Sequence, residues 1–537
     1  MKLYIMRIIL ILVIITSSSI IFAADDENCD WDNKANTTEN NNQYEPSVTV
    51  VQGSGTYAGY FIIVWTGNNQ FNSGGSGWDI YAQRYDNGGT EIGVETLINI
   101  NTSGDQIHPS VAMNNSGNMV ITWQSGNDKI VYRTWSIFPA SASLGTSEIV
   151  VKNQDGVRNP EAGIDDSGRV GITWFHTTNE NSNGDVFARG YNYTGTPMLY
   201  DLTVSADSDD IELYPTIDMN GSGDFVIAWQ KQDDDPDNKK DFGIHARKYY
   251  WSGGSLTNYT EIVVNTISSD QQNYPSVSID QVGNFVIAWQ SYMDTTSWDI
   301  YARRYYSNST PIDTPEFVVN NYSTSQQKLP SVDMDLDGDF LIAWQNNGTS
   351  NNSWDIHAVE YWWDTSNKPP EIKKSEFKVN SCTYNDQIEP SVAVYNLDTD
   401  DSFYGIAWQG NTNDPPWSMD IFFKSFEDQN EDAITLDYFS ATQERKHVVL
   451  NWQTGTEIDN LGFYLVRSEN IGSDYLQVND EIIPTNGGNN VNGSFYSYND
   501  YNVRPGKLYF YWLISVDIYG DCNVYGPVKI ITYLDMK

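Results

Sequence analysis

The sequence predicts an all-β protein, a seven-bladed β-propeller followed by a β-sandwich. One short segment recurs almost unchanged, as GDFVIAWQ at Gly223–Gln230, GNFVIAWQ at Gly283–Gln290 and GDFLIAWQ at Gly338–Gln345. The segments between the copies alternate apolar and polar residues and lack helical periodicity. Near residues 428–433 the repeat stops and a different strand pattern begins. These observations give the fold class and a two-domain organisation.

Each copy of the repeat starts at a Pro and reaches a Trp 14 to 19 residues later. The copy that begins at Tyr274 contains four strand-like segments, YPSVSID, FVIAWQ, WDIYARRY and EFVVN. Four short antiparallel strands in each repeat of ~40–60 residues are typical of a propeller blade, whereas a solenoid, the alternative, requires capping repeats. The seven Pro–Trp pairs are Pro46 and Trp65, Pro109 and Trp123, Pro160 and Trp174, Pro215 and Trp229, Pro275 and Trp289, Pro330 and Trp344, and Pro390 and Trp408.

The seventh copy lacks its fourth strand, and the N-terminal segment is predicted to supply it. After MDIFFKSF at Met419–Phe426, no equivalent of EFVVN precedes the next domain. Asn36 and Thr37 align with Asn265 and Thr266 of a complete copy, at the same distance from the following strand. Closing the ring removes an unpaired sheet edge. We therefore expect Asp30–Asn36 to pair with the seventh blade.

The repeated FVIAWQ strand is expected to build the frame of each blade. Its Trp should pack between neighbouring blades, because a ligand rarely needs the same buried Trp seven times. A sugar platform at these Trp positions is the alternative.

The C-terminal module, residues 434–537, contains seven strand-like segments. It resembles a fibronectin type III-like sandwich, a member of the immunoglobulin-like class. Trp452 stands in the second segment, where that family packs a core Trp, and Pro505–Gly520 resembles the family's penultimate strand. The resemblance implies a spacer or docking module, with Trp452 in the core.

The N-terminus predicts export. Lys2 and Arg7 precede an apolar stretch, and small residues follow near Ala23, as in a secretory signal peptide over residues 1–23. A membrane anchor is the alternative, although the apolar stretch is short for a span of ~20 residues. The mature chain, with the propeller at 30–429 and the sandwich at 434–537, is expected to be secreted or held at the cell surface. Its three cysteines, Cys29, Cys382 and Cys522, allow one disulfide, and the sequence does not choose the pair.

The chain is strongly acidic, with 30 Lys and Arg against 71 Asp and Glu, a formal net charge of −41. Such a surface repels nucleic acid and anionic membranes. We therefore expect no nucleic-acid partner and no membrane insertion. The oligomeric state is not indicated.

The repeat resembles those of secreted bacterial propeller proteins, on IDQVGNFVIAWQ and WDIYARRY. Sialidases are also propellers, but their Asp-box, S-x-D-x-G-x-T-W, differs from the turn in this chain. A sialidase-like reading would require three Arg side chains around one carboxylate. Arg133, Arg189, Arg247 and Arg303 occupy one recurring third-strand position, where blade one has Gln83. This recurrence favours a place on the blade surface over a converging clamp.

One stretch, DMDLDGDF, predicts a calcium loop. Calcium prefers several oxygen ligands in a tight turn, and D-x-D-x-D-G begins many such loops. The stretch DMDLDGDF resembles the opening of the calcium loops in integrin-type repeats. The equivalent turns in blades four and five lack these ligands, so a plain type I turn with Gly in the left-handed position is the alternative. The candidate metal ligands are Asp333, Asp335, Asp337 and Asp339.

Four Trp residues near the start of third strands are candidate ligand-binding residues, since Trp can stack on a sugar ring. They are Trp78, Trp298, Trp354 and Trp417. The sequence favours a non-catalytic binding or scaffold protein that recognises a protein or a glycan. The alternative is a carbohydrate-active enzyme, and it gains if these Trp side chains lie on one open face beside carboxylates. No catalytic residue can be assigned from the sequence.

Overall fold

We analysed a computed structural model of the chain. It describes residues 32–37, 42–53, 55–68, 77–138, 144–177, 184–205, 210–232, 241–252, 255–266, 271–293, 297–321, 325–348, 353–365, 369–380, 385–396, 402–411, 419–427, 434–457, 460–469, 476–479, 481–485, 493–517 and 522–533. The proposed signal peptide, Trp417, Cys29 and Cys382 lie outside these ranges, as does the side chain of Cys522.

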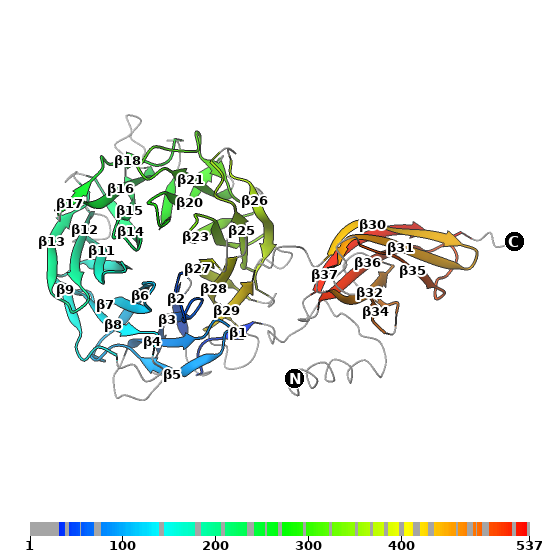
Figure 1. Ribbon diagram of the computed structural model, residues 1–537, viewed down its shortest axis with the longest axis horizontal. Helices are drawn as coiled ribbons and strands as arrows, with labels where there is room; N and C mark the ends of the chain where they lie inside the picture. Colours follow the sequence, from blue (N-terminus) through cyan, green and yellow to red (C-terminus); the bar gives the residue numbers. More distant parts are fainter. Residues whose placement is uncertain are drawn as a thin grey trace. The chain divides into compact units, whose positions relative to one another are not determined.

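The chain divides into two compact units, one spanning Asn28–Asp428 and the other containing Gln429–Lys537. In the first unit, the described residues form seven antiparallel sheets of four or five strands, arranged in a ring (Figure 1). We call these sheets blades 1 to 7 in the order of their inner strands. The all-β propeller fold predicted from the repeat is confirmed.

The strands of the first three blades follow one another in the chain. Blade 1 contains β2 (Gln43–Val50), β3 (Phe61–Asn68), β4 (Trp78–Tyr85) and β5 (Glu91–Leu97). Blade 2 contains β6 (Gln106–Met113), β7 (Asn118–Ser125), β8 (Lys129–Ser136) and β9 (Ile149–Asn153). Blade 3 contains β10 (Val157–Ile164), β11 (Arg169–Thr177), β12 (Gly184–Asn192) and β13 (Pro197–Thr203).

The next three blades keep this order. Blade 4 contains β14 (Glu212–Met219), β15 (Phe225–Gln232), β16 (Phe242–Ser252), β17 (Ser255–Asn258) and β18 (Ile262–Val263). Blade 5 contains β19 (Gln272–Ile279), β20 (Phe285–Met293), β21 (Ser297–Tyr305) and β22 (Phe317–Val318). Blade 6 contains β23 (Gln327–Met334), β24 (Phe340–Asn346), β25 (Asp355–Tyr361) and β26 (Ile372–Lys378).

Blade 7 is built from both ends of the propeller sequence. It contains β27 (Gln387–Asn396), β28 (Ser402–Asn411), β29 (Met419–Glu427) and, as its outer strand, β1 (Asn33–Lys34). Asn33 faces Phe423 and Lys34 faces Phe422 in the antiparallel pairing. The N-terminal segment therefore supplies the missing fourth strand, as the alignment of Asn36 with Asn265 predicts.

Hydrogen bonds of the closing segment reproduce those of complete blades. Asn36 Oδ1 accepts from Ile421 N at 2.8 Å, and Asn265 Oδ1 accepts from Ile244 N at 2.7 Å. One residue later, Thr37 N donates to a Glu95 carboxylate oxygen, just as Thr266 N donates to the carboxylate of Glu316. The Asn-Thr pair alone located the closing strand in the sequence, because Asn36-Thr37 makes the same contacts as Asn265-Thr266 of a complete blade.

The repeated Trp residues form the cores between blades. All seven are fully buried, with 0% of their surface exposed. Trp65 of blade 1, for example, packs in one cluster with Ala407 and Ile421 of blade 7. Five of the seven indoles also donate a hydrogen bond to a Gln near the start of the inner strand of their own blade: Gln43, Gln106, Gln272, Gln327 and Gln387. These Trp side chains are frame residues, as expected.

The second unit consists of two antiparallel sheets. One sheet contains β30 (Ile434–Glu444), β31 (His447–Glu457) and β35 (Phe495–Asp500). The other contains β32 (Asn460–Ser468), β33 (Leu476–Gln477), β34 (Ile483–Pro484), β36 (Leu508–Asp517) and β37 (Cys522–Ile531). Trp452 from the first sheet packs against Phe463 from the second in a shared core, and it is fully buried, as predicted. The likeness to fibronectin type III modules stays a prediction.

The part of the chain that the structure describes contains no helix long and apolar enough to cross a membrane.

Candidate functional site

A ring of strained residues surrounds one end of the propeller channel. Each inner strand carries a bulge at its repeat Pro, and the residue before that Pro has a positive φ between 47° and 56°. This left-handed conformation is uncommon for a residue other than Gly, and such strain clusters at functional sites. We call these residues the pre-proline ring: Glu45, His108, Asn159, Tyr214, Tyr274, Leu329 and Glu389.

The Gln of the repeated AWQ segment holds the ring in place across blade boundaries. Gln409 Oε1 of blade 7 accepts from Glu45 N at 2.9 Å, and Gln345 of blade 6 accepts in the same way from Glu389 N at 3.1 Å. Leu329 N and Tyr274 N make the equivalent bonds to the Gln of the preceding blade, Gln290 and Gln230. The Gln that follows the repeated Trp thus accepts from the backbone of the ring residue of the next blade in four blades, whereas Gln124 of blade 2 donates to Gly126 O instead.

The ring departs from this pattern between blades 1 and 2, where Thr66 replaces the Gln. Here the Glu45 carboxylate, in place of a Gln side chain, accepts the hydrogen bond from the backbone of the next ring residue. Its Oε2 accepts from His108 N at 2.8 Å and from Thr66 Oγ1 at 2.9 Å. Its Oε1 lies 2.8 Å from His108 Nδ1. Glu45 and His108 are thus joined by both backbone and side-chain contacts, and Glu389 stands beside them on blade 7.

The three ring residues are held in different protonation states. Burial opposes ionisation of Glu45, but hydrogen bonds and the charge of His108 outweigh it and lower the pKa of Glu45. Burial likewise disfavours the charged imidazole, yet the contacts with Glu45 raise the pKa of His108. Burial and repulsion from Glu45 raise the pKa of Glu389 to about 7. The contact between Glu45 and His108 therefore favours the charged form of both, next to a Glu389 carboxyl group whose pKa is raised to about 7.

A fourth titratable group continues this cluster into the channel. Glu161 on β10 replaces the Ser or Thr that follows the repeat Pro in the other blades. Burial raises its pKa to about 7, although a hydrogen bond with Ser110 and the charge of His108 act in the opposite direction.

A cavity of about 200 Å³ opens at the carboxylates, over blades 7, 1 and 2. Trp78, one of the predicted ligand-binding residues, lines it together with Tyr44, and their rings meet edge to face with centroids 5.2 Å apart. The remaining lining residues are Glu45, Thr66, Ile107, Glu389 and Gln409. Trp78 therefore lies beside carboxylates, which meets for one of the four candidate Trp residues the condition set for carbohydrate binding.

Two other predicted Trp residues lie at the equivalent blade positions. Trp298 of blade 5 and Trp354 of blade 6 flank Lys328, whose Nζ lies 5.8 Å and 5.7 Å from the two ring centroids. Both Trp side chains are partly exposed. Trp417 lies outside the described residues.

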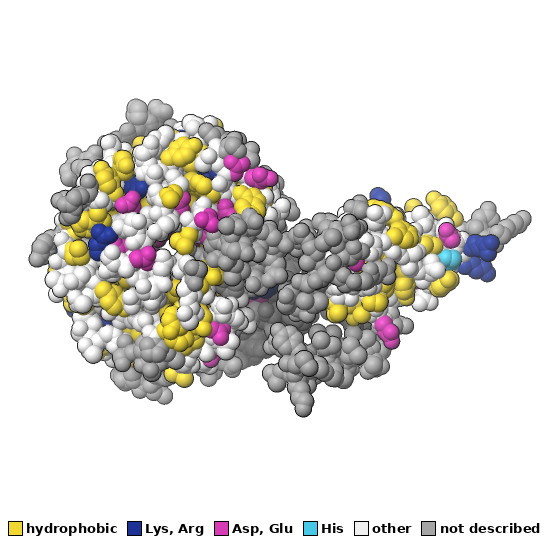
Figure 2. Space-filling view, in the orientation of Figure 1, with side chains coloured by type: hydrophobic (Ala, Val, Ile, Leu, Met, Phe, Trp, Pro, Cys, Tyr) yellow, Lys and Arg dark blue, Asp and Glu magenta, His cyan; other side chains and the backbone are white. Residues whose placement is uncertain are grey.

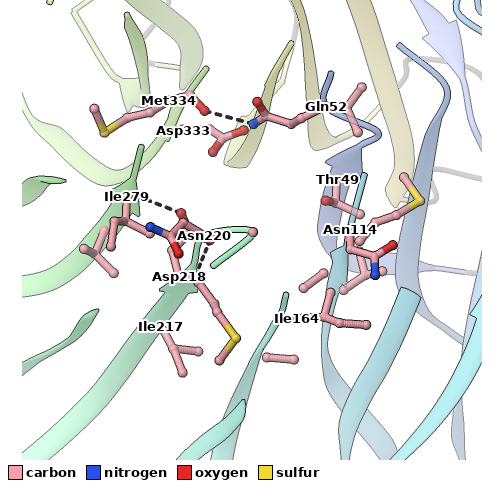
Figure 3. A pocket seen from close by; sticks show the side chains of 18 of the residues that line it. Thr49, Gln52, Asn114, Ile164, Ile217, Asp218, Asn220, Ile279, Asp333 and Met334 are labelled. Atoms are coloured by element: carbon pink, nitrogen blue, oxygen red, sulfur yellow. Dashed lines mark hydrogen bonds between the residues drawn. The ribbon is translucent and has the colours of Figure 1, made fainter. Parts of the chain in front are cut away.

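The channel itself forms a second cavity of about 200 Å³, lined by inner-strand residues of all seven blades (Figure 3). Within it, Ser278 Oγ of blade 5 lies 2.9 Å from Asp218 Oδ2 and 3.0 Å from Asp333 Oδ1. Gln52 Nε2 donates to Met334 O at 3.0 Å, as Figure 3 shows. Burial raises the pKa of both aspartates, and repulsion from Asp218 contributes to the pKa of Asp333, about 8.

The four aspartates proposed as calcium ligands do not converge on one point. Asp333 accepts from Val394 N and Ser278, whereas Asp335 Oδ1 accepts from the backbone of Asp337, Gly338 and Asp339. Asp339 accepts from Trp363 N. No group of three or more His, Cys, Asp or Glu in the described ranges is placed to hold a metal ion. The donor set therefore does not fit one calcium ion, and calcium stays a prediction from the motif alone.

The turn interpretation of the same stretch fits the structure. Gly338 has a φ of 100° and donates to Asp335 O at 3.2 Å, so the left-handed Gly closes the turn that the Asp335 side chain caps. Asp333 and Asp335 would point to the same face if the strand continued through both. Because β23 ends at Met334, they do not: Asp333 faces the channel and Asp335 caps the turn.

The recurring Arg residues bind backbone rather than converge. Arg303 Nη1 donates to Val264 O of the preceding blade at 2.7 Å, and Arg247 donates to Val204 O at 2.6 Å. Arg133 and Arg189 bind Ile98 O and Val151 O in the same way. They join neighbouring blades, so the expectation that they do not form a converging clamp fits the structure. The expected place on the blade surface is wrong for Arg133 and Arg303, which are buried.

Sequence reasoning missed the pre-proline ring. The residue before each Pro varies from Glu to His, Asn, Tyr and Leu, so it does not stand out as a motif. Two signals were available: the column of varied, mostly polar residues beside an invariant Pro, and the change from AWQ to VWT at Thr66.

The fold and this site define a propeller with an acidic, aromatic-walled cavity at one end of its channel. On the propeller in Figure 2, the Lys and Arg side chains in view are scattered among magenta carboxylates. No protein-family model and no curated protein matches the sequence.

Several solved structures share the general architecture at low identity. A Dyadobacter fermentans protein of unknown function is 11% identical, with a TM-score of 0.41, over 76% of this chain and 98% of its own. A Penicillium chrysogenum alpha-L-arabinanase, solved with arabinobiose, is 10% identical, with a TM-score of 0.39, over 59% of this chain and 93% of its own. The polysaccharide lyase Uly1 is 9% identical, with a TM-score of 0.43, over 70% and 89%. These likenesses concern the fold alone.

Proposed function

We propose that this protein binds a carbohydrate in the cavity beside the pre-proline ring, and that it does so outside the cytoplasm. The observation that carries the proposal is the placement of Trp78 and Tyr44 next to Glu45 and Glu389 in one cavity. Aromatic faces pack on the apolar side of a sugar ring, and carboxylates accept hydrogen bonds from its hydroxyl groups. The rigid propeller serves as the platform, as the sequence favours.

Replacing Trp78 by Ala is expected to weaken glycan binding about tenfold or more, because an aromatic anchor in a cavity contributes roughly 2 kcal/mol. A glycan array on the mature protein would identify the ligand, and titration calorimetry would then compare the variants. Trp251→Ala is the matched control, since Trp251 is a partly exposed Trp near the far end of a third strand, stacked on Arg169. Equal affinities for Trp78→Ala and wild type would argue against this cavity as the site.

Hydrolysis of a bound glycan is a second candidate, supported by the separated protonation of two neighbouring carboxyl groups. Glycosidases pair a protonated acid with an ionised carboxylate. Here Glu389, with its pKa near 7, would supply the acid, while Glu45 is the ionised partner. For hydrolysis, Glu45 would accept a proton from the attacking water while Glu389 protonates the leaving oxygen, and this requires Oε1 or Oε2 to exchange its contact with His108 or Thr66 for that water.

For this candidate we expect Glu389→Gln to abolish the release of reducing ends from the bound glycan while affinity changes less than threefold. The measurement is a reducing-sugar assay alongside calorimetry. If wild type releases no product from any glycan that it binds, the protein is a binding module and the hydrolytic candidate is rejected.

A further inference from the structure

Lys328 is an ammonium group framed by two aromatic rings. It lies on β23 of blade 6, next to Leu329 of the pre-proline ring. Its Nζ lies 5.8 Å from the centroid of Trp298 and 5.7 Å from that of Trp354. The two Trp residues come from adjacent blades, so Lys328 stands at the boundary between them. This is a cation–π arrangement with a partly exposed charge.

The ring of Trp298 and the backbone of Trp354 are positioned by contacts other than those with Lys328. The ring of Trp298 packs against Tyr292, with centroids 5.2 Å apart. The backbone of Trp354 is fixed to blade 7, because its N donates to Asp386 Oδ1 at 3.1 Å and its O accepts from Gln387 N at 2.8 Å. The Trp298 ring and the strand start that carries Trp354 are therefore held without requiring the ammonium between the two rings.

The Lys328 ammonium makes no ion pair and donates no hydrogen bond within the described part of the chain. This is unusual in a protein with 71 acidic residues against 30 basic ones, where most lysines can find a carboxylate. Lys129, Lys231 and Lys373, for instance, lie within 4 Å of an Asp or Glu. An ammonium has three donors, and a site that leaves them available favours an incoming anion.

We propose that Lys328, Trp298 and Trp354 form an anion-selective subsite, which binds a sugar unit that carries a carboxylate or sulfate group. This inference rests on the proposed glycan-binding function and names its substrate class. The sugar ring would pack on a Trp face while its acidic group pairs with the ammonium. Lys328 and Trp78 occupy the same end of the blades, since Trp78, Trp298 and Trp354 hold equivalent repeat positions. A glycan chain that reaches Trp78 would therefore extend along blades 7 and 6 towards Lys328.

The test uses matched pairs of polysaccharides that differ in charge alone. Polygalacturonate is compared with its methyl ester, and dextran sulfate with dextran, by affinity electrophoresis and calorimetry of the mature protein. We expect at least one charged member to bind about tenfold more tightly than its neutral counterpart, the effect of one charge-assisted contact. Preference for polygalacturonate assigns a carboxylate, and preference for dextran sulfate assigns a sulfate.

Variants separate the subsite from general electrostatics. Lys328→Met is expected to remove the preference for the charged glycan with an unchanged melting temperature, and Lys328→Arg is expected to retain it. Lys129→Met is the matched control, because it deletes one positive charge at the same end of blade 2, where Lys129 lies 3.7 Å from Asp128. Equal losses in Lys328→Met and Lys129→Met would overturn the subsite.

The possible failures are distinguishable. If a glycan binds and Trp78→Ala weakens it, but charged and neutral members bind equally, the anionic subsite is wrong and the proposed function stands. If no glycan on the array or in these pairs binds, the proposed function fails and the subsite fails with it.

Discussion

Replacing Asp333 by Asn is expected to raise the melting temperature of the propeller at pH 8 and to leave it nearly unchanged at pH 4. The folded-state pKa of Asp333 is about 8, because the group is buried and faces Asp218. Its value in an unfolded chain is ~3.9, so the native protein retains a proton that the unfolded chain releases. The stability of the wild type is therefore highest below that lower value and falls as the pH rises towards 8.

The Asn side chain can take the place of the protonated carboxyl group. Its oxygen can accept from Val394 N, which now donates to Asp333 Oδ2 at 2.7 Å, and its amide can donate to Ser278 Oγ. Ser278 would still donate to Asp218. Because the pKa rises from ~3.9 to about 8 on folding and each unit corresponds to ~1.4 kcal/mol, removing the titration and the repulsion should stabilise the propeller at pH 8 by up to about 5 kcal/mol. Thermal unfolding followed by circular dichroism from pH 4 to pH 9 measures the effect.

Asp313→Asn provides a contrast of opposite sign. Asp313 is buried and accepts two hydrogen bonds from the Arg304 side chain, at 2.9 Å and 3.0 Å, so its negative charge is paired. Removing that charge should destabilise the protein at pH 8, since it leaves the guanidinium without its partner. A loss of stability in Asp333→Asn that is equal at pH 4 and pH 8 would show that acceptor geometry, and not charge, governs the channel site.

Asn36→Ala is expected to lower the free energy of unfolding of the propeller by about 2–4 kcal/mol, because two buried hydrogen bonds are lost. Asn36 Nδ2 donates to Asp420 Oδ1 at 2.8 Å, and Asn36 Oδ1 accepts from Ile421 N at 2.8 Å. The strand that these bonds anchor, β1, has only two residues. Limited proteolysis should therefore cut the variant near residues 32–37 before the rest of the propeller unfolds.

Asn380→Ala is the matched control, since Asn380 makes the same two bonds, to Ile356 N and Asp355, inside a blade of continuous chain. We expect a similar local loss there without early cleavage at the N-terminus. If the two variants melt alike and neither is cut near residue 36, the closing strand does not limit the stability of the ring.

Much of the fold could be predicted because nearly the same strand sequences recur in every blade. The Pro and Trp of each copy locate the inner and second strands, and Asn36 with Thr37 locates the closing strand, because these residues make local contacts that every blade needs. The pre-proline ring could not be predicted in this way. A residue before Pro is expected in an extended conformation, and here seven such residues are left-handed.

The candidate site depends on contacts between blades that are far apart in the sequence. Glu45 and Glu389 are neighbours only because blade 7 closes against blade 1, and Asp218 reaches Asp333 across blade 5. Trp78 could be proposed from its position at the start of a third strand, but its carboxylate neighbours could not. The acidic motif at Asp333–Asp339 predicted calcium ligands, whereas in the structure Asp333 lines the channel and Asp335 caps a turn.

The closing strand also sets an order of events during folding. The contact between Asn36 and Asp420 joins positions 384 residues apart, so blade 7 cannot be completed until nearly the whole propeller has left the ribosome. After β29 has emerged and until β1 pairs with it, β29 presents an unpaired edge, the kind of edge that recruits strands from other molecules. Loop closure over such a distance is slow compared with pairing inside a blade. The last step in making this ring is therefore the step most exposed to competition from a second nascent chain.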